Sequence, residues 1–364
     1  YEPDGDDCGA LAEVCRRLDG IPLALELAAA RTATIPPPEL AERLTERFAL
    51  LAGGSRDSVA RQRTIEASVA WSYQLLDPGE QRVFRWLSAF AGTFPMSAAA
   101  ALLVDEPDVE DVIDRLQRCS LLVDRPGPVR RIHLLEPVRW FARERLIDAG
   151  EADDALGRHL DWCIATAITN GAALEEPEVL AALTQLDLDL DNFRAAMDWA
   201  LTHGRPADAA RIVAATPWFW IWRGRALEAR RWLHRSGDDI DRLLTTGEQI
   251  RLLWARASLG INTTSPGWRD AASDGIALAR TQGDTRWEAR FQVLVSQAQA
   301  FNDPHTVLAQ AEAQRERCIA AGERFWAATS LVSESLAQIT LGRFDLAQPL
   351  LDQLRVEAQA LEHP

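Results

Sequence analysis

The chain has 364 residues, of which 47% are hydrophobic and 26% are charged, and its formal net charge is −15 at pH 7. This length allows two or three domains with cores of their own, and no uncharged apolar run is long enough to span a membrane. The acidic balance disfavours direct binding of nucleic acid by this chain, because such binding depends on basic patches that displace counterions.

The residues needed for metal binding or catalysis do not occur in a recognised pattern. Five cysteines lie far apart without CxxC spacing, which favours neither a disulfide framework nor a zinc site, and a reducing cytoplasm is the expected location. The sequence has no GxSxG elbow, no HExxH helix and no plausible Cys/His dyad. We therefore predict no catalytic residue and no metal ligand in this chain.

Residues 1–52 contain three helical patterns, near 10–18, 22–33 and 38–50. Gly20 and three consecutive prolines separate them, and Pro22 suits the first turn of the second helix. These patterns predict a small helical subdomain. The polar run that follows, through residue 63, predicts a linker.

Residues 61–150 show helical patterns that begin at Thr64 and then cover 79–90, 97–104 and 109–119. Two short β-prone runs, 121–123 and 130–134, flank a Pro-Gly turn and predict a hairpin, and a last helix is predicted over 137–149. Helices followed by a hairpin are typical of a winged helix. Its 109–119 helix carries more acidic than basic residues, which disfavours DNA recognition. For His133 we expect a structural role, partly buried in a strand.

Residues 151–364 show consecutive amphipathic helices with internal repeats. GRxxxA begins at Gly204, Gly224 and Gly342, and G[DE]xxWxA begins at Gly283 and Gly322. We expect each glycine to end a helix in a left-handed cap, and each alanine to let the next helix pack closely. The prediction is a helical solenoid. The complete fold class predicted is mainly α: a helical subdomain, a winged helix with a small β-hairpin, and the solenoid.

Two features of the repeat region allow more than one interpretation. The aromatic residues at 218, 219, 220 and 222 either line a ligand groove or pack in the core, and packing in the core is favoured. The arginines beside them, at 223, 225, 230 and 231, indicate a solvated helix face rather than a binding site for an anionic partner. The alternating Asp187, Asp189 and Asp191 lack the rest of a calcium loop, so we expect solvated capping groups, with a helix beginning at Asp191.

Several blocks resemble the signal-transduction ATPases of the NB-ARC/STAND type and the large bacterial regulators of the LuxR and AfsR type. The turn Gly20-Ile21-Pro22-Leu23 resembles the one that follows their phosphate-binding core. SYQLLDPGEQRVFRWLSAF (72–90) is similar to the start of their winged helix. LLEPVRWFARERL (134–146) resembles their Met-His-Asp segment, with Leu135 in place of the histidine. Blocks 186–201 and 217–233 resemble the junction with a tetratricopeptide repeat (TPR) array, and 341–351 is similar to the turn of one repeat.

The resemblance implies that the parent protein binds ATP or ADP and acts as a slow ATPase switch, with Gly20 and Pro22 at the nucleotide. The phosphate-binding GxxxxGK[ST] loop is not in this sequence, which contains no lysine, so we expect a piece of a longer polypeptide. The implied function is the regulatory and sensor portion of an ATP-dependent transcriptional regulator. A protein partner or small-molecule inducer would bind the TPR-like array, DNA would be bound only through an effector domain elsewhere, and activation could involve oligomerisation. The alternative is a TPR-like interaction scaffold that uses no nucleotide.

Overall fold

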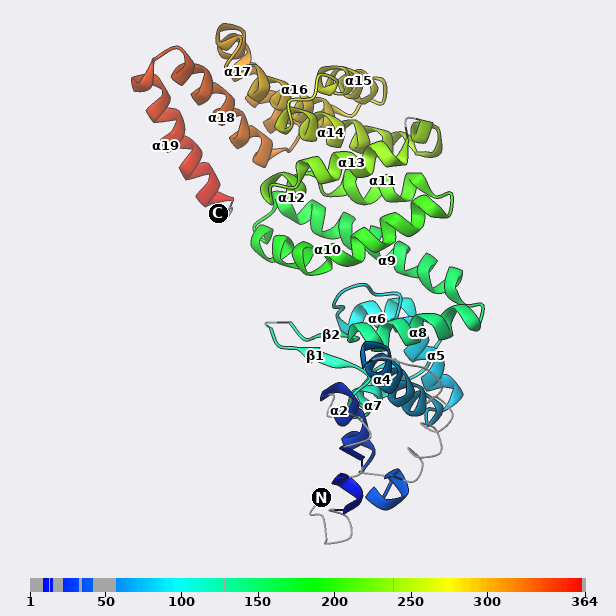
Figure 1. The fold of residues 1–364 in the computed structure, drawn as a ribbon. Helices are drawn as coiled ribbons and strands as arrows, with labels where there is room; N and C mark the ends of the chain where they lie inside the picture. Colours follow the sequence, from blue (N-terminus) through cyan, green and yellow to red (C-terminus); the bar gives the residue numbers. More distant parts are fainter. Residues whose placement is uncertain are drawn as a thin grey trace. The chain divides into compact units, whose positions relative to one another are not determined.

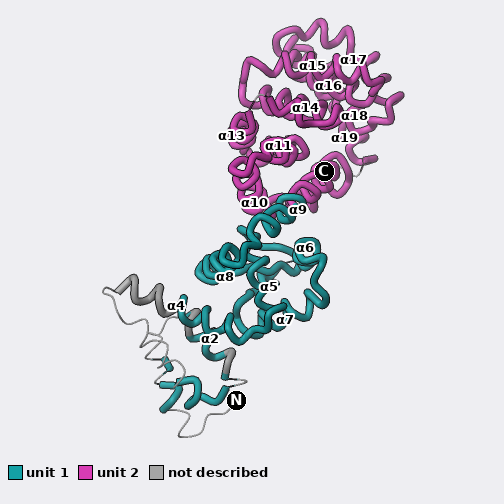
Figure 2. Tube along the Cα trace, turned by 90° about the vertical axis from the view of Figure 1, so that its right-hand side faces the viewer, with its two compact units in different colours: residues 1–162 teal, residues 163–364 magenta. Residues whose placement is uncertain are grey.

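The computed structural model describes residues 9–12, 14, 15, 22–32, 35–41, 57–127, 129–237 and 239–361. The chain divides into two compact units, Tyr1–Trp162 and Cys163–Pro364 (Figure 2). The described part is almost entirely helical and contains one antiparallel two-stranded sheet (Figure 1), which confirms the mainly α fold class. Among the described helices, none combines the length and the apolar character needed to cross a membrane.

Unit 1 contains short helices and one hairpin in the predicted order. Its elements are α2 (Pro22–Arg31), α4 (Asp57–Gln74), α5 (Pro78–Leu87), α6 (Met96–Leu102), α7 (Val109–Arg118), β1 (Val123–Arg125), β2 (Arg131–His133) and α8 (Glu136–Asp148). Residues 9–12, 14, 15 and 37–41 are also helical. Val14, Ala28, Leu40 and Trp71 form one small buried cluster, so α4 packs on the N-terminal helices.

Helix α4 corrects the prediction of a linker that ends at residue 63. The helix begins at Asp57 and continues without interruption to Gln74. Nothing between these residues is a glycine or a proline, and the arginines and glutamine of the polar run favour a helix. The polarity of this run therefore did not indicate an irregular chain.

Helix α5 begins at a capping box formed by Asp77 and Glu80. The Glu80 amide donates to Asp77 Oδ1 at 2.8 Å, and the Asp77 amide donates to Glu80 Oε2 at 3.0 Å. These bonds satisfy amides that the first turn of a helix leaves without partners. The buried face of α5 places Phe84 and Trp86 in the core, where Phe90 stacks on Phe94 with ring centroids 4.3 Å apart.

Strand β2 of the hairpin forms hydrogen bonds with the segment that connects α5 to α6. Strands β1 and β2 pair antiparallel with Val123 opposite His133, and Phe94 and Ile132 exchange two backbone hydrogen bonds of 2.8 Å. Arg131 is buried and donates to the hydroxyl and the carbonyl of Thr93, each at 2.7 Å. His133 lies in β2 and is partly buried, as predicted.

Helix α7 presents an acidic outer face. Val112 and Ile113 are buried, whereas Glu110 and Asp111 are exposed. The Arg115 guanidinium lies 2.6 Å from a carboxylate oxygen of Glu80, so a basic group of this helix is already paired. A phosphate backbone would meet mainly negative charge on this face.

Unit 2 is an array of helices in which each helix packs on the next (Figure 1). Helix α9 (Ala152–Ala172) has residues in both units. The elements that follow are η1 (Ala173–Glu175), α10 (Val179–Thr202), α11 (Pro206–Ala215), α12 (Pro217–Trp222), α13 (Ala226–Ser236), η2 (Asp239–Leu243), α14 (Thr246–Asn262), α15 (Trp268–Thr281), α16 (Thr285–Gln299), α17 (Pro304–Ala320), α18 (Arg324–Thr340) and α19 (Phe344–Ala360). Helices α14–α19 form three pairs, α14 with α15, α16 with α17, and α18 with α19. Helix α16 also contacts α14 and α18, so the first helices of these pairs form a continuous layer.

The glycine turns of the repeats have the predicted left-handed conformation. The φ angles are +70° at Gly204, +66° at Gly224, +66° at Gly283, +77° at Gly322 and +71° at Gly342. At the last of these, the Arg343 amide donates to the Gln338 carbonyl at 2.9 Å, as in a Schellman cap. The alanines that follow in the motif, at 209, 229, 289, 328 and 347, are buried. Both parts of the prediction are confirmed.

Helix α10 corrects the interpretation of the acidic stretch from 187 to 191. The helix runs through Asp191 from Val179, so Asp191 begins no helix. Asp189 and Asn192 are fully buried, and Asp189 accepts a hydrogen bond of 2.7 Å from Gln185. The sequence favoured a cap because aspartate is common there, but tertiary packing gave the residue an interior position.

Candidate functional site

A cavity of about 470 Å³ lies within unit 2. It is lined by the C-terminal ends of α9 and α11, by η1, by the start of α12, and by α14 and α16. Three tryptophans, at 218, 254 and 287, and three arginines, at 251, 286 and 290, supply much of its wall. A cavity of this size suits a small molecule.

The tryptophans of the wall form one connected cluster around Trp254. The ring centroid of Trp254 lies 6.2 Å from Trp218, 5.6 Å from Trp287 and 5.0 Å from Trp326. Trp326 is fully buried and stands at the position of Trp287 in the second copy of G[DE]xxWxA. One tryptophan of the wall, Trp287, therefore comes from the repeated motif, and its counterpart Trp326 packs against Trp254.

Of the aromatic residues at 218, 219, 220 and 222, some pack in the core and others lie at the cavity. Phe219 and Trp220 are fully buried, as the core interpretation predicts. Trp218 lines the cavity, as the groove interpretation predicts, and Trp222 is 41% exposed and stacks on Trp218 at 5.8 Å. The neighbouring arginines are largely engaged: Arg223 pairs with Asp187 at 2.6 Å, and Arg230 donates to Thr263 and Ser265 at 2.9 Å each.

Arg290 forms the central ion pairs of the cavity wall. Its Nη2 lies 3.0 Å from Glu175 Oε2 and 2.7 Å from Glu323 Oε2, and its guanidinium lies over the ring of Trp287 at 5.0 Å. Only 16% of the Arg290 side chain, 15% of Glu175 and 4% of Glu323 are exposed. These charges are removed from water and depend on one another.

Glu175 connects the start of the array to its later repeats. Its carboxylate accepts a hydrogen bond of 3.2 Å from the indole nitrogen of Trp326, which lies 151 residues further along the chain. Burial raises the pKa of Glu175, while Arg290 acts against that rise. The residue therefore sits where desolvation and a cation compete.

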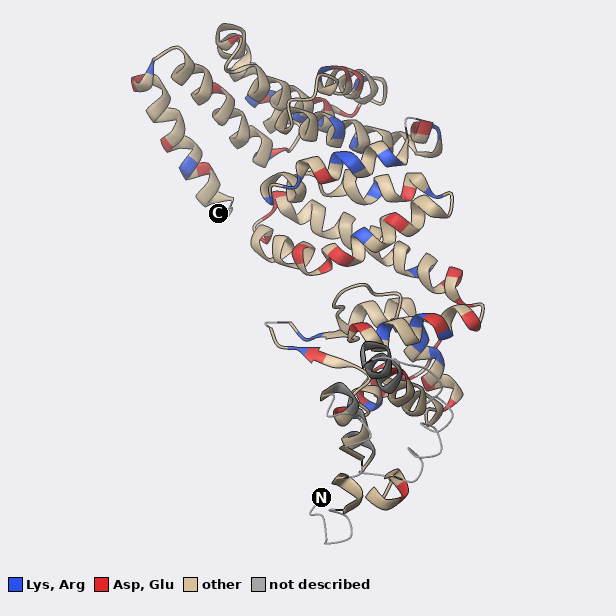
Figure 3. Cartoon of the chain, in the orientation of Figure 1, with Lys and Arg blue, Asp and Glu red and all other residues tan. Residues whose placement is uncertain are grey.

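Other ion pairs of unit 2 join neighbouring repeats. Arg194 donates to Glu228 at 2.7 Å, 34 residues away, and Arg211 donates to Glu248 at 2.7 Å, 37 residues away. Figure 3 shows acidic and basic residues interspersed along α11, α13 and α14. Such pairs attach each repeat to the next one, as the quasi-one-dimensional order of a solenoid requires.

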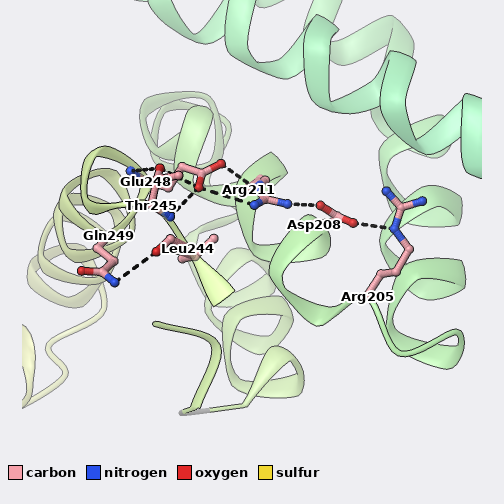
Figure 4. A network of polar contacts seen from close by, with 7 residues as sticks. All are labelled: Arg205, Asp208, Arg211, Leu244, Thr245, Glu248 and Gln249. Carbon is pink, nitrogen blue, oxygen red and sulfur yellow. Dashed lines mark hydrogen bonds and ion pairs between the residues drawn. The ribbon is translucent and has the colours of Figure 1, made fainter. Parts of the chain in front are cut away.

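The Arg211–Glu248 pair belongs to a polar network beside the cavity (Figure 4). Glu248 also accepts from the amide and the hydroxyl of Thr245, each at 2.8 Å, and Arg211 pairs in addition with Asp208. The hydrogen bond from Arg211 lowers the pKa of Glu248 to about 2. The network fastens α11 to α14, two helices that line the cavity.

Arg251 differs from the other arginines of the wall. It is exposed on α14, three residues before Trp254, and its guanidinium forms no hydrogen bond or ion pair with any residue that the structure describes. A smaller cavity next to the first also has Ile168 and Arg251 in its wall.

Gly171 determines how closely α9 approaches α11. A Cβ atom at this position would lie 1.9 Å from the carbonyl oxygen of Ala215. No side chain fits there without a shift of the backbone. Both residues line the cavity, so its wall depends on this glycine.

Of the two residues predicted at the nucleotide, the structure describes Pro22, which does not line this cavity. Gly20 lies outside the described residues, and Pro22 is the exposed first residue of α2. Leu135, in the place of the histidine of the resembled motif, is the N-cap residue of α8. Within the described ranges, no group of three or more His, Cys, Asp or Glu side chains is arranged to hold a metal ion.

Sequence reasoning missed the charged residues of the cavity. The repeated G[DE]xxWxA motif contains Trp287 and Trp326, so a search for side chains shared by the repeats could have found the aromatic part. Glu175 and Arg251 lie in no repeated motif, and nothing in the local sequence marks them.

No protein-family model matches the chain. It is 32% identical to a Mycobacterium tuberculosis protein named "Putative HTH-type transcriptional regulator", over 97% of this chain and 46% of that protein, and the same values hold for a protein of that description in Mycobacterium bovis. It is 31% identical to the regulatory protein AfsR of Streptomyces coelicolor, over 55% of this chain and 22% of AfsR. The chain thus spans about half the length of the mycobacterial relatives.

Among solved structures, the chain is similar to a STAND protein with a tetratricopeptide repeat sensor from Pyrococcus horikoshii. The sequence identity is 13%, the TM-score is 0.38, and the match covers 94% of this chain and 60% of that protein.

Proposed function

We propose that this chain, which resembles bacterial transcriptional regulators of the AfsR type, is the regulatory and sensor portion of an ATP-dependent STAND regulator. In this proposal residues 1–52 complete a nucleotide-binding module, residues 61–150 form a winged helix, and residues 151–364 form a TPR-like sensor. ATP or ADP is held in the whole protein, which acts in the cytoplasm, with Gly20 and Pro22 at the nucleotide.

The observation that carries the sensor role is the cavity of unit 2. Its walls come from the ends and inner helices of several successive repeats, so a bound molecule would contact α9, α11, α14 and α16 at once. Solenoids commonly bind their targets on such surfaces. A ligand that fits one arrangement of these helices better than another would shift the protein between two states.

Binding of DNA is assigned to an effector domain outside this chain. The net charge of −15 and the acidic outer face of α7 support this assignment, because both would repel phosphate. Unit 1 would then transmit the state of the nucleotide rather than read a base sequence.

The test uses the full-length protein that contains this chain, because the phosphate-binding loop is not in this sequence. We expect it to bind ADP in isothermal titration calorimetry. Pro22→Ala should weaken that binding about tenfold, the size of one lost positioning contact. Pro206→Ala is the matched control, because Pro206 occupies the first turn of α11 in unit 2. Absence of ADP binding by the full-length wild type would contradict the nucleotide switch.

The second candidate is a TPR-like interaction scaffold that uses no nucleotide. The observation that favours it is Leu135, which has no group able to donate to a phosphate where the resembled motif has histidine. This candidate predicts a full-length protein that neither binds ADP nor responds to Pro22→Ala, and the same titration therefore separates the two.

A further inference from the structure

The charged groups around the unit 2 cavity differ in whether the protein already pairs them. Arg290 is engaged by Glu175 and Glu323, and Arg286 by Glu323. Asp284 accepts a hydrogen bond of 3.1 Å from the backbone amide of Trp287 and so caps α16. Arg251 alone among these three arginines has a guanidinium without a partner in the described part of the chain.

The carboxylates of the wall leave room for an anion. Glu175 shares its charge with Arg290, and Asp284 is held by the helix terminus. Glu176 is exposed, so solvent screens its charge. The cation available to a ligand is therefore Arg251.

The rest of the wall selects flat apolar groups. Trp218 and Trp287 supply aromatic surface, Trp254 adds little because only 2% of it is exposed, and Ile168, Ala214 and Ala215 add aliphatic surface. Aromatic rings pack against such walls in stacked or edge-to-face arrangements.

We propose that the cavity binds a flat, mainly apolar small molecule that bears one anionic group, with its ring against Trp218 and Trp287 and its charge at Arg251. The ligand class rests on the sensor role proposed above and specifies its chemistry. Arg251 would act by a charge-assisted hydrogen bond, which is stronger than a neutral one.

The experiment compares two probes that share a ring but differ in charge. The complete 364-residue chain is titrated with 2-naphthoate and with 2-naphthalenemethanol by calorimetry. We expect 2-naphthoate to bind with a Kd of a few mM or tighter, and about tenfold more tightly than the alcohol.

Two variants locate the effect. Arg251→Gln should bind both probes equally, because it removes the charge and leaves a polar, shorter side chain. Arg355→Gln should keep the tenfold preference, since Arg355 is an exposed arginine of α19 outside the cavity wall. Circular dichroism checks that both variants remain folded.

Three results would overturn the ligand class: equal binding of the two probes by the wild type, binding of neither up to about 5 mM, or a preference that survives Arg251→Gln. If both probes bind equally in the cavity, the sensor role stands and only the anionic ligand is wrong. If the full-length protein binds no ADP while the anion preference is found, the nucleotide switch fails and the ligand class holds.

Discussion

Two parts of unit 2 are held together in different ways. Around α11 and α14, ion pairs such as Arg211–Glu248 join a repeat to the next one, 37 residues along the chain. Around η1, α16 and α18, Glu175 joins the beginning of the array to residues more than two repeats away. The first arrangement is what any solenoid needs for its continuity. The second arrangement involves two residues of the cavity wall, Glu175 and Arg290, together with the buried Trp326.

The pKa values of two carboxylates in these regions are shifted in opposite directions. Arg211 and Thr245 hold the pKa of Glu248 at about 2, whereas burial raises the pKa of Glu175. The folded state therefore gains stability from the charge of Glu248 and loses stability from the charge of Glu175. Burial of the Glu175 carboxylate therefore costs stability at neutral pH, whereas the ion pair of Glu248 adds stability there.

The largest effect is expected from Gly171→Ala in the cavity region. The added Cβ would meet the Ala215 carbonyl at 1.9 Å, so α9 must move, and we expect a loss of about 3 kcal/mol or more in the free energy of unfolding. Gly204→Ala, in a repeat turn with φ of +70° and nothing within 4 Å, should lose only about 1 kcal/mol. Urea denaturation followed by tryptophan fluorescence compares them, and equal losses would remove the distinction between the regions.

Arg290→Met should come next, with a loss of about 2–3 kcal/mol. It leaves Glu175 and Glu323 buried without their shared cation, and breaking one side of a buried pair is costly. The double variant Arg290→Met/Glu175→Gln should recover about 1 kcal/mol or more, because it removes the carboxylate that has lost its cation, whereas Glu323 keeps its ion pair with Arg286. Urea denaturation at pH 7 measures both, and a double variant less stable than the single one would show that the ion pairs are not the cause.

Glu248→Gln should lose about 1 kcal/mol at pH 7, since it removes a partly exposed ion pair and a capping acceptor. The pKa of Glu248 is depressed in the folded state, so this stabilisation is fully present above the ordinary value near 4.5 and disappears as pH falls to about 2. Unfolding measured across this range should show the wild type and the variant converge. A difference that does not depend on pH would assign the loss to packing.

Glu175→Gln should have the smallest effect, a change below about 1 kcal/mol at pH 7, because Gln keeps an acceptor for Trp326 and Arg290 keeps Glu323. The raised pKa of Glu175 means that the wild type loses stability as pH rises above the ordinary value near 4.5. The variant lacks this titration, so its stability should fall less between pH 4.5 and pH 7. An equal pH dependence in both proteins would show that Glu175 is not desolvated as described.

The repeat region was the most predictable part of the fold. Each glycine in the two motifs has a positive φ and each motif alanine is buried, because a tight helical turn leaves few alternatives at those positions. The helix at Asp57 and the interior position of Asp189 were missed because both depend on which face the tertiary structure covers. Glu175 could not be predicted, since its partners come from distant repeats and the curvature that joins them is not a local property.

The hydrogen bond between Glu175 and Trp326 also has a consequence for synthesis. A chain emerging from the ribosome can stack its early helices as soon as each pair is complete, because those contacts are local. The contact to Trp326 must wait for 151 further residues, and the loop that it closes is long. A nascent chain that ends before α18 would therefore carry the first helices of the array with Glu175 still without this hydrogen bond.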